Sequence, residues 1–269
     1  DRDGTVNNYC GRYRSSIQSI YNGLFLTRFV QKHAQCPIIV TSGPLQGPGI
    51  LDVSITAQGA FVYAGSKGRE FMDLKGRIHR CPIEEDKQQI LNELNARLRA
   101  KVEKPGFEKF ALIGSGLQFK FGQTTIARQD VSKSVDAGES EQFLKTVSKL
   151  VQELDPGGEN LRIEDTGLDI EIILTVSTKQ GLKDFDKGDA VNYLNKALDL
   201  NMQNKEHLVC GDTLSDLPML TATLEHSDKT CAIFVTKDPD LSSKVSQICP
   251  DSLIVTSPDV LVTILGQLP

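Results

Sequence analysis

Long apolar runs, a strong net charge and paired cysteines are all missing from this sequence of 269 residues. No stretch approaches the roughly 18 uninterrupted apolar residues that a membrane-spanning helix needs, and no signal peptide opens the chain. With a net charge of −5, the composition argues against a nucleic-acid-binding protein. We therefore expect a cytoplasmic protein without membrane or nucleic-acid partners, whose oligomeric state the composition does not set.

The six cysteines do not form CxxC pairs, and several lie in apolar segments, such as Cys210 in HLVCGD and Cys231 in TCAIFV. This spacing is typical of neither a zinc site nor a disulfide framework. We predict that these cysteines are reduced and buried.

Apolar residues are 39% of the chain and charged residues 24%, as in ordinary globular proteins. Strands and helices alternate at both ends of the sequence, which indicates a parallel sheet covered on both faces. We predict a helix at 14–33, strands at 38–41 and 60–64, helices at 189–200, 214–224, 240–248 and 259–268, and strands at 207–210, 231–236 and 253–257.

The middle of the chain has a different character. Its expected elements are amphipathic helices at 83–102 and 140–154, a strand–turn–strand at 110–128, and strands at 161–164 and 169–176. The predicted fold class is therefore α/β: a Rossmann-like doubly wound parallel core (1–74 and 185–269) with an inserted α+β cap domain (75–184). The strand that should end at Asp1 is not in the sequence, so we expect the chain to be a fragment of a longer one.

The chain opens with Asp1-Arg2-Asp3-Gly4-Thr5. Two carboxylates two residues apart, on a segment that turns at a glycine, can face one cation, and their charges push their pKa values apart. One can then act as a nucleophile and the other as an acid. A calcium loop also uses DxDG, but that loop needs a glutamate at its twelfth position, where this sequence has Arg12.

Two further segments could hold a phosphoryl group. Thr41 and Ser42 follow an apolar strand and precede Gly43, where a hydroxyl and free N–H groups can bind a phosphoryl oxygen. Lys187 opens the first core helix after the insertion and can balance phosphate charge. Each feature alone also fits a plain strand end or a surface lysine.

The strand HLVC ends in Gly211-Asp212, and a helix follows at about Leu214. Asp212 at a strand end can bind Mg²⁺, with Asp216 supporting it one turn later. Helix capping could explain Asp216, but it does not explain Asp212.

Together, in this order, DRDGT, TS before GP, Lys187 and GDTLSD resemble the four motifs of the haloacid dehalogenase superfamily. The resemblance implies that Asp1 attacks phosphorus and that Asp3 serves as general acid and base. It implies that Mg²⁺ is held by Asp1, the Asp3 main-chain carbonyl and Asp212, and that Lys187 with Thr41 or Ser42 binds the phosphoryl oxygens.

The cap strands carry polar residues that could bind sugar hydroxyls in pairs, although the same alternation fits a sheet face turned to solvent. The order DxDGT, TSGPL, YAGSKGREF, LDIEIIL, DKGDAV and GDTLSDLPML is similar to trehalose-6-phosphate phosphatases. That resemblance implies a small sugar-phosphate substrate. It also implies substrate-binding roles for Glu70, in Gly-x-x-Gly-x-Glu, and for three cap residues: Lys109, Lys120 and Glu171. Gln118 is a fourth cap candidate, from the alternating polar residues of the first hairpin.

The sequence departs from that family where it reads SGP in place of SGR and where Lys67 replaces a usual histidine. Three alternatives therefore stay open: another sugar-phosphate phosphatase, a phosphosugar mutase, and a catalytically inactive binding domain. The intact Asp1, Asp3, Lys187 and Asp212 argue against the last of these.

Overall fold

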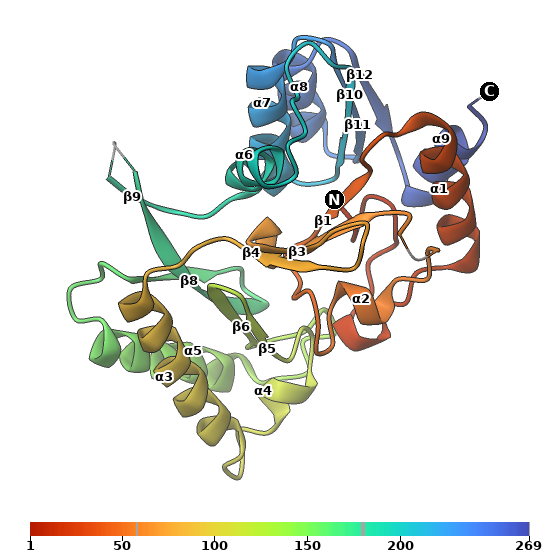
Figure 1. The fold of residues 1–269 in the computed structure, drawn as a ribbon. Helices are drawn as coiled ribbons and strands as arrows, with labels where there is room; N and C mark the ends of the chain where they lie inside the picture. Colours follow the sequence, from red (N-terminus) through yellow and green to blue (C-terminus); the bar gives the residue numbers. More distant parts are fainter. Residues whose placement is uncertain (58, 179–180, 269) are drawn as a thin grey trace. The chain divides into compact units, whose positions relative to one another are not determined.

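Two units, each with its own hydrophobic core, account for the residues that the computed structural model describes, 1–57, 59–178 and 181–268. Unit 1 comprises Asp1–Tyr9, Ser16–Cys81 and Asp186–Pro269, and unit 2 comprises Cys10–Ser15 and Pro82–Phe185. Figure 1 traces both units along the chain. Among the described residues, no helix combines the length and the apolar character needed to cross a membrane.

Unit 1 contains two sheets. One has the order β1-β2-β3-β4, with β1 and β2 parallel and the β3–β4 hairpin antiparallel, and the other is the fully parallel β10-β11-β12. Their strands are β1 (Ile38–Val40), β2 (Val62–Gly65), β3 (Glu70–Met72), β4 (Ile78–Arg80), β10 (His207–Gly211), β11 (Thr230–Val235) and β12 (Ser252–Val255).

Helices cover both faces of the β10–β12 sheet. Figure 1 shows α6, α7 and α8 on one side and α1 and α9 on the other. These helices, with the short α2, are α1 (Ile20–His33), α2 (Ile50–Val53), α6 (Lys187–Ala197), α7 (Leu217–His226), α8 (Pro239–Ile248) and α9 (Pro258–Gly266). Apolar side chains of α1, α9 and the strands share one core, which includes Leu26, Ile233 and Leu261.

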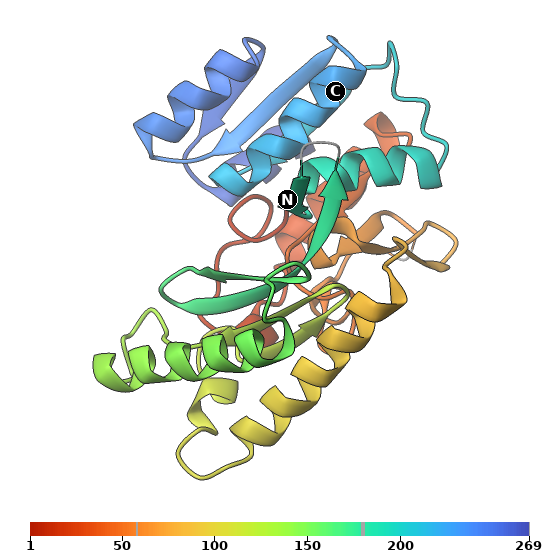
Figure 2. The same cartoon turned by 90° about the vertical axis from the view of Figure 1, so that its left-hand side faces the viewer.

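Unit 2 is an antiparallel sheet with two long helices. Its order is β5-β6-β8-β7, and β9 also pairs with β8. The elements are α3 (Glu85–Val102), α4 (Lys109–Leu112), β5 (Leu117–Lys120), β6 (Gln123–Ala127), α5 (Ala137–Leu154), β7 (Leu161–Asp165), β8 (Asp169–Thr178) and β9 (Gly181–Asp184). Both views show α3 and α5 on the same side of this sheet (Figures 1 and 2).

The core of unit 2 follows from helical and strand periodicity. Leu91, Leu94 and Leu98 recur at helical spacing on α3 and are fully buried, and so are Ile170 and Ile172, two residues apart on β8. Apolar strand residues thus face the helices. The alternate residues of the same strands form the opposite face.

The predicted fold class is confirmed, with corrections to individual elements. The predicted helix at 14–33 begins only at Ile20, because Ser19 has extended backbone angles and its side chain caps the helix by accepting from the N–H of Asn22. The strands β3, β4 and β9 were not expected. The cysteines are free, as predicted, but only Cys249 is buried and Cys10 and Cys231 are exposed.

Candidate active site

Asp1 lies at the carboxyl end of β10, although the two are far apart in the sequence. Its main-chain nitrogen donates to the carbonyl oxygen of Cys210 at 2.9 Å. This hydrogen bond places the Asp1 side chain beside the loop that follows β10, which begins at Asp212. Carboxyl ends of parallel strands are where open α/β sheets gather functional groups.

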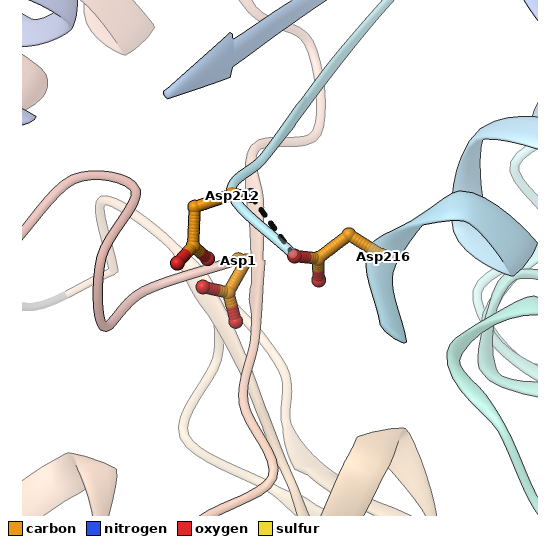
Figure 3. A group of neighbouring side chains, drawn as sticks. All are labelled: Asp1, Asp212 and Asp216. Atoms are coloured by element: carbon orange, nitrogen blue, oxygen red, sulfur yellow. Dashed lines mark hydrogen bonds between the residues drawn. The ribbon is translucent and has the colours of Figure 1, made fainter. Parts of the chain in front are cut away.

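Three carboxylates meet at this point. Asp1, Asp212 and Asp216 each offer one oxygen, and these oxygens lie within 4.8 Å of one another (Figure 3). Oxygen donors from carboxylates are the ligands that hard divalent cations prefer. The group of side chains therefore fits such a cation.

Asp216 is fixed by the local turn. Its Oδ2 accepts from the main-chain N–H groups of Asp212 and Thr213, both at 3.0 Å, and the first of these bonds is the dashed line in Figure 3. The residue is fully buried. Burial opposes its charge, but the Lys187 ammonium and these donors outweigh that cost and lower the pKa of Asp216.

Lys187 supplies the positive charge of the site. Its ammonium donates to Oδ1 of Asp1 at 2.6 Å and to Oδ1 of Asp216 at 2.5 Å. The helix α6 begins at Lys187 because Asp186 caps it, accepting from the N–H groups of Gly188 and Asp189. The cap thus sets the position from which the lysine reaches both carboxylates.

Asp212 has a different electrostatic environment from Asp216. Burial raises the pKa of Asp212, and the nearby charge of Asp216 adds to the effect. Hydroxyl groups partly offset this: Thr5 donates to its Oδ1 at 3.1 Å and Tyr9 to its Oδ2 at 2.7 Å. Although 68% of Tyr9 is exposed, loss of water around its hydroxyl raises its pKa, with the carboxylate of Asp212 next in effect, so the phenol stays protonated and keeps donating.

Thr5 lies between the carboxylates of Asp1 and Asp212. Its hydroxyl lies 3.0 Å from Oδ2 of Asp1 and 3.1 Å from Oδ1 of Asp212. Our sequence reasoning took Thr5 only as part of the first motif and missed Tyr9 altogether. A polar residue at each of these positions was visible in DRDGTVNNY, but its partner was not.

Asp3 is not one of the three clustered carboxylates. Its Oδ1 accepts from Arg2 Nη1 at 2.5 Å and from Ser16 Oγ at 2.9 Å. The structure also separates the two candidate hydroxyls after β1. Thr41 is buried and its Oγ1 accepts from the N–H of Gly43 at 3.1 Å, whereas Ser42 is exposed.

Glu70 lies in unit 1, where its carboxylate accepts hydrogen bonds from neighbouring protein groups. It is buried, and its Oε1 accepts from the N–H of Leu45 at 3.3 Å and from the hydroxyl of Ser66 at 2.9 Å. These contacts tie β3 to the loop that follows Thr41 and Ser42. Glu70 therefore helps to hold that loop, and its predicted role in substrate binding stays a prediction.

In unit 2, the sheet face opposite the helices brings together three of the four predicted cap residues. Gln118 and Glu171 lie in one row across the sheet, each paired with Thr125 of β6, and Lys120 is two residues along from Gln118. Asp169 lies on the same face, where its Oδ2 accepts from Ser115 at 2.8 Å. Burial raises the pKa of Asp169, while the nearby charge of Lys120 lowers it and that of Glu171 raises it.

Lys109 is elsewhere in unit 2. It lies on the short helix α4, not at the start of a hairpin, and its ammonium donates to Glu139 Oε2 on α5 at 2.7 Å. The segment KFAL is helical where we expected a strand. The helix replaces the first part of the strand predicted at 110–128, because four residues are too few to establish a period, and a substrate-binding role for Lys109 stays a prediction.

Comparison with known proteins gives a consistent result. Residues 1–261 match the family described as "Trehalose-6-phosphate phosphatase, C-terminal". The chain is 33% identical over 99% of its length to a protein of Aphelenchoides avenae named alpha,alpha-trehalose-phosphate synthase [UDP-forming] 1, of which it covers 24%. It is 32% identical over its whole length to a trehalose-phosphatase of Brugia malayi, of which it covers 55%.

Solved structures agree on the fold. The C-terminal domain of Candida albicans trehalose-6-phosphate phosphatase superposes with a TM-score of 0.58, covering 98% of this chain and 88% of that one at 13% identity. A phosphatase of the haloalkanoate superfamily from Bacteroides thetaiotaomicron, BT1666, gives a TM-score of 0.52, covering 98% and 91% at 12% identity. The chain thus has the fold of that superfamily.

Proposed function

Since this chain belongs to the trehalose-6-phosphate phosphatase C-terminal family, we propose that it hydrolyses trehalose 6-phosphate to trehalose and inorganic phosphate. The observation that carries the proposal is the meeting of Asp1, Lys187, Asp212 and Asp216 at the end of β10. A phosphate ester brought to this point faces one carboxylate nucleophile and one fixed ammonium.

In the proposed reaction, a carboxylate oxygen of Asp1 bonds to phosphorus while the bond from phosphorus to the sugar oxygen breaks. The electron pair of that bond stays with the sugar oxygen, which takes a proton from Asp3. Asp3 then removes a proton from a water molecule, which attacks the aspartyl phosphate and releases phosphate and free Asp1. Two displacements at one phosphorus atom thus return the protein to its starting state.

Lys187 serves this reaction through its charge. Its ammonium, 2.6 Å from Oδ1 of Asp1, offsets the negative charge that would otherwise repel an incoming phosphate. Because Lys187 is also paired with buried Asp216, it is held in place before substrate arrives. We assign the second phosphate contact to Ser42, since its hydroxyl is exposed while that of Thr41 is buried.

Mg²⁺ is the cation that we propose for the carboxylate group. Asp1 and Asp212 would hold it, with the Asp3 main-chain carbonyl, and Asp216 would fix the Asp212 loop through its main-chain hydrogen bonds. When bound, Mg²⁺ offsets the charge on carboxylate and phosphate oxygens. The clustering of Asp1 with Asp212 supports this assignment.

For the substrate, we propose that Gln118, Lys120 and Glu171 on the sheet of unit 2 bind sugar hydroxyls. Their shared sheet face supports this role, and Asp169 with Ser115 is added to the set. Lys109, which pairs with Glu139, and Glu70, which accepts from the N–H of Leu45, stay substrate-binding predictions that rest on the family resemblance. We also propose that units 1 and 2 are the catalytic core and the cap.

The test is phosphate release by the full-length protein from trehalose 6-phosphate, sucrose 6-phosphate and glucose 6-phosphate, with Mg²⁺ and then with EDTA. We expect release from trehalose 6-phosphate alone, abolished by EDTA and by Asp1→Asn and unchanged by Asp228→Asn, which alters an exposed aspartate. Equal release of phosphate from all three esters would agree with the proposed mechanism but contradict the proposed specificity for trehalose 6-phosphate.

A binding domain without catalysis is the second candidate, because the curated relatives include proteins named as synthases, of which this chain covers 18% to 24%. Trehalose 6-phosphate that binds the folded protein without release of phosphate would favour it. A dependence on an added sugar bisphosphate would favour a mutase instead.

A further inference from the structure

A buried arginine stands between the two aspartates of the first motif. Arg2 is 1% exposed, and its guanidinium donates to Asp3 Oδ1 at 2.5 Å, to Ser16 Oγ at 3.1 Å and to the carbonyl oxygens of Ser16 and Val53. A guanidinium keeps its charge at all working pH values and can only donate, so Arg2 binds oxygen acceptors. Within the part of the chain that the structure describes, Asp3 supplies the carboxyl group among these acceptors.

Ser16 completes the contact from the other side, and the direction of its hydrogen bond is fixed. Its hydroxyl lies near Arg2 Nη1, near Asn7 Nδ2 at 3.3 Å and near Asp3 Oδ1 at 2.9 Å. The guanidinium and the amide NH₂ can only donate, so the serine oxygen accepts from both. Its single hydrogen therefore points to Asp3.

Both donors meet the same oxygen of Asp3. For the described residues, the carboxylate of Asp3 has no hydrogen bond other than those two, and both end on Oδ1. The side chain is 21% exposed, in contrast to the buried Arg2 and Ser16 behind it. One oxygen is thus anchored and the other, Oδ2, is left for an incoming group.

We propose that Arg2 and Ser16 are positioning residues for acid–base catalysis, which hold Asp3 by Oδ1 so that Oδ2 exchanges the proton with the leaving sugar oxygen and then with water. This inference rests on the proposed function, in which Asp3 is the acid and base. Proton transfer requires the donor within hydrogen-bond reach of the reacting oxygen. A carboxylate clamped at one oxygen loses rotational freedom before substrate binds, so this alignment is in place at the start of the reaction.

The experiment compares two leaving groups in the full-length protein with Mg²⁺. The sugar oxygen of trehalose 6-phosphate needs a proton to leave, whereas the phenolate of p-nitrophenyl phosphate leaves without one. We expect Ser16→Ala to lower kcat/KM for trehalose 6-phosphate by about 10- to 100-fold, the range found when a supporting hydrogen bond is lost at a site. For p-nitrophenyl phosphate, kcat/KM should change less than about twofold.

The neighbouring Ser15 gives a matched control, because its side chain is exposed and Ser15→Ala should leave both substrates unaffected. Ser16→Thr keeps the hydroxyl and should restore most of the rate. Arg2→Lys keeps the charge but loses the forked geometry, and should show the same leaving-group dependence as Ser16→Ala. With trehalose 6-phosphate alone, the loss in Ser16→Ala should be in kcat with KM nearly unchanged.

Asp3→Asn tests the acid–base role of Asp3 separately from its positioning by Arg2 and Ser16. An Asp3→Asn loss confined to trehalose 6-phosphate, not reproduced by Ser16→Ala or Arg2→Lys, would overturn this inference and leave the proposed function intact. An equal fall of kcat/KM for both substrates in Ser16→Ala would reduce Ser16 to a structural role. Wild-type protein that releases phosphate from neither ester would refute the proposed function, and the inference with it.

Discussion

The ammonium of Lys187 lies 2.6 Å from the carboxylate of Asp1, 186 residues earlier in the chain. The same ammonium neutralises Asp216, which is fully buried. Removing one partner of a buried ion pair leaves an uncompensated charge and costs about 3–5 kcal/mol. Lys187→Met should therefore lower the free energy of unfolding by about that amount and abolish phosphate release.

Urea unfolding followed by circular dichroism measures the first effect. Lys196 lies on the same helix and is exposed, so Lys196→Met is the matched control and should change stability by less than about 0.5 kcal/mol. Equal stability of the two variants would contradict the buried ion pair.

Gly4 is a second point at which the site depends on one residue. It has φ of +89°, and a Cβ there would lie 2.1 Å from Oδ2 of Asp212. Gly4→Ala should displace Asp212 and weaken Mg²⁺ binding by about 10- to 100-fold. Isothermal titration calorimetry measures the Mg²⁺ affinity of both proteins directly.

Gly76→Ala is the control that distinguishes displacement of Asp212 from backbone strain. Its φ is +80°, but a Cβ there would meet nothing within 4 Å. Gly76→Ala should cost about 1–2 kcal/mol of stability for the left-handed conformation and leave Mg²⁺ affinity unchanged. A similar loss of affinity in both variants would show that strain, not contact with Asp212, is responsible.

Because three carboxylates lie close together, neutralising Asp212 should stabilise the folded protein when no cation is bound. The pKa of Asp212 is raised in the folded protein, so folding favours the protonated side chain. The contribution of Asp212 to the free energy of unfolding is therefore fully present below the pKa of the unfolded state and is lost as pH rises through the raised pKa of the folded state. At neutral pH in EDTA, Asp212→Asn should therefore raise the melting temperature. Mg²⁺ should raise the melting temperature of the wild type but not that of Asp212→Asn.

Thermal melts in EDTA and in Mg²⁺ test both statements, with Asp228→Asn as the exposed control. If Mg²⁺ left the melting temperature of the wild-type protein unchanged, this result would argue against the cation site.

Asp73 gives a prediction for the β3–β4 hairpin. Its carboxylate accepts from His79 Nε2, from Arg77 Nε and from the N–H groups of Lys75 and Arg77. The hydrogen bond from His79, followed by those from Arg77, holds the pKa of Asp73 well below its ordinary value of 3.8. The stabilisation is therefore complete above that value and is lost as pH falls through the lowered pKa.

Asp73→Asn should accordingly lower the urea midpoint at about pH 7, and the difference from the wild type should shrink below about pH 4. Urea titrations at several pH values give this comparison. A difference that stays constant into the acid range would mean that the asparagine loses packing, not charge.

Much of the fold could be predicted because its elements have clear periods. The apolar positions Leu91, Leu94 and Leu98 predicted α3, and the strands HLVC and CAIFVT contain the apolar runs LVC and CAIFV. The hairpin β3–β4 was missed because each strand has three residues, too few to show alternation.

The first motif and GDTLSD could be predicted as neighbours because parallel strands end at one edge of a sheet. The surroundings of those residues could not. The sequence gives no sign that Arg2 is buried, because its partners Ser16 and Val53 come near it only in the folded chain. Tyr9 reaches Asp212 across 203 residues for the same reason.

The discontinuity of unit 1 has a consequence for the newly made protein. Domains fold as units during synthesis, and contacts between distant residues form late. Most of unit 2 is one continuous stretch, Pro82–Phe185, that is synthesised before Lys187 and Asp212. A chain that ends before Lys187 thus contains all of unit 2 while Asp1 still lacks Lys187 and Asp212, so a translation product shortened to that point would lack the charged partners of the proposed site.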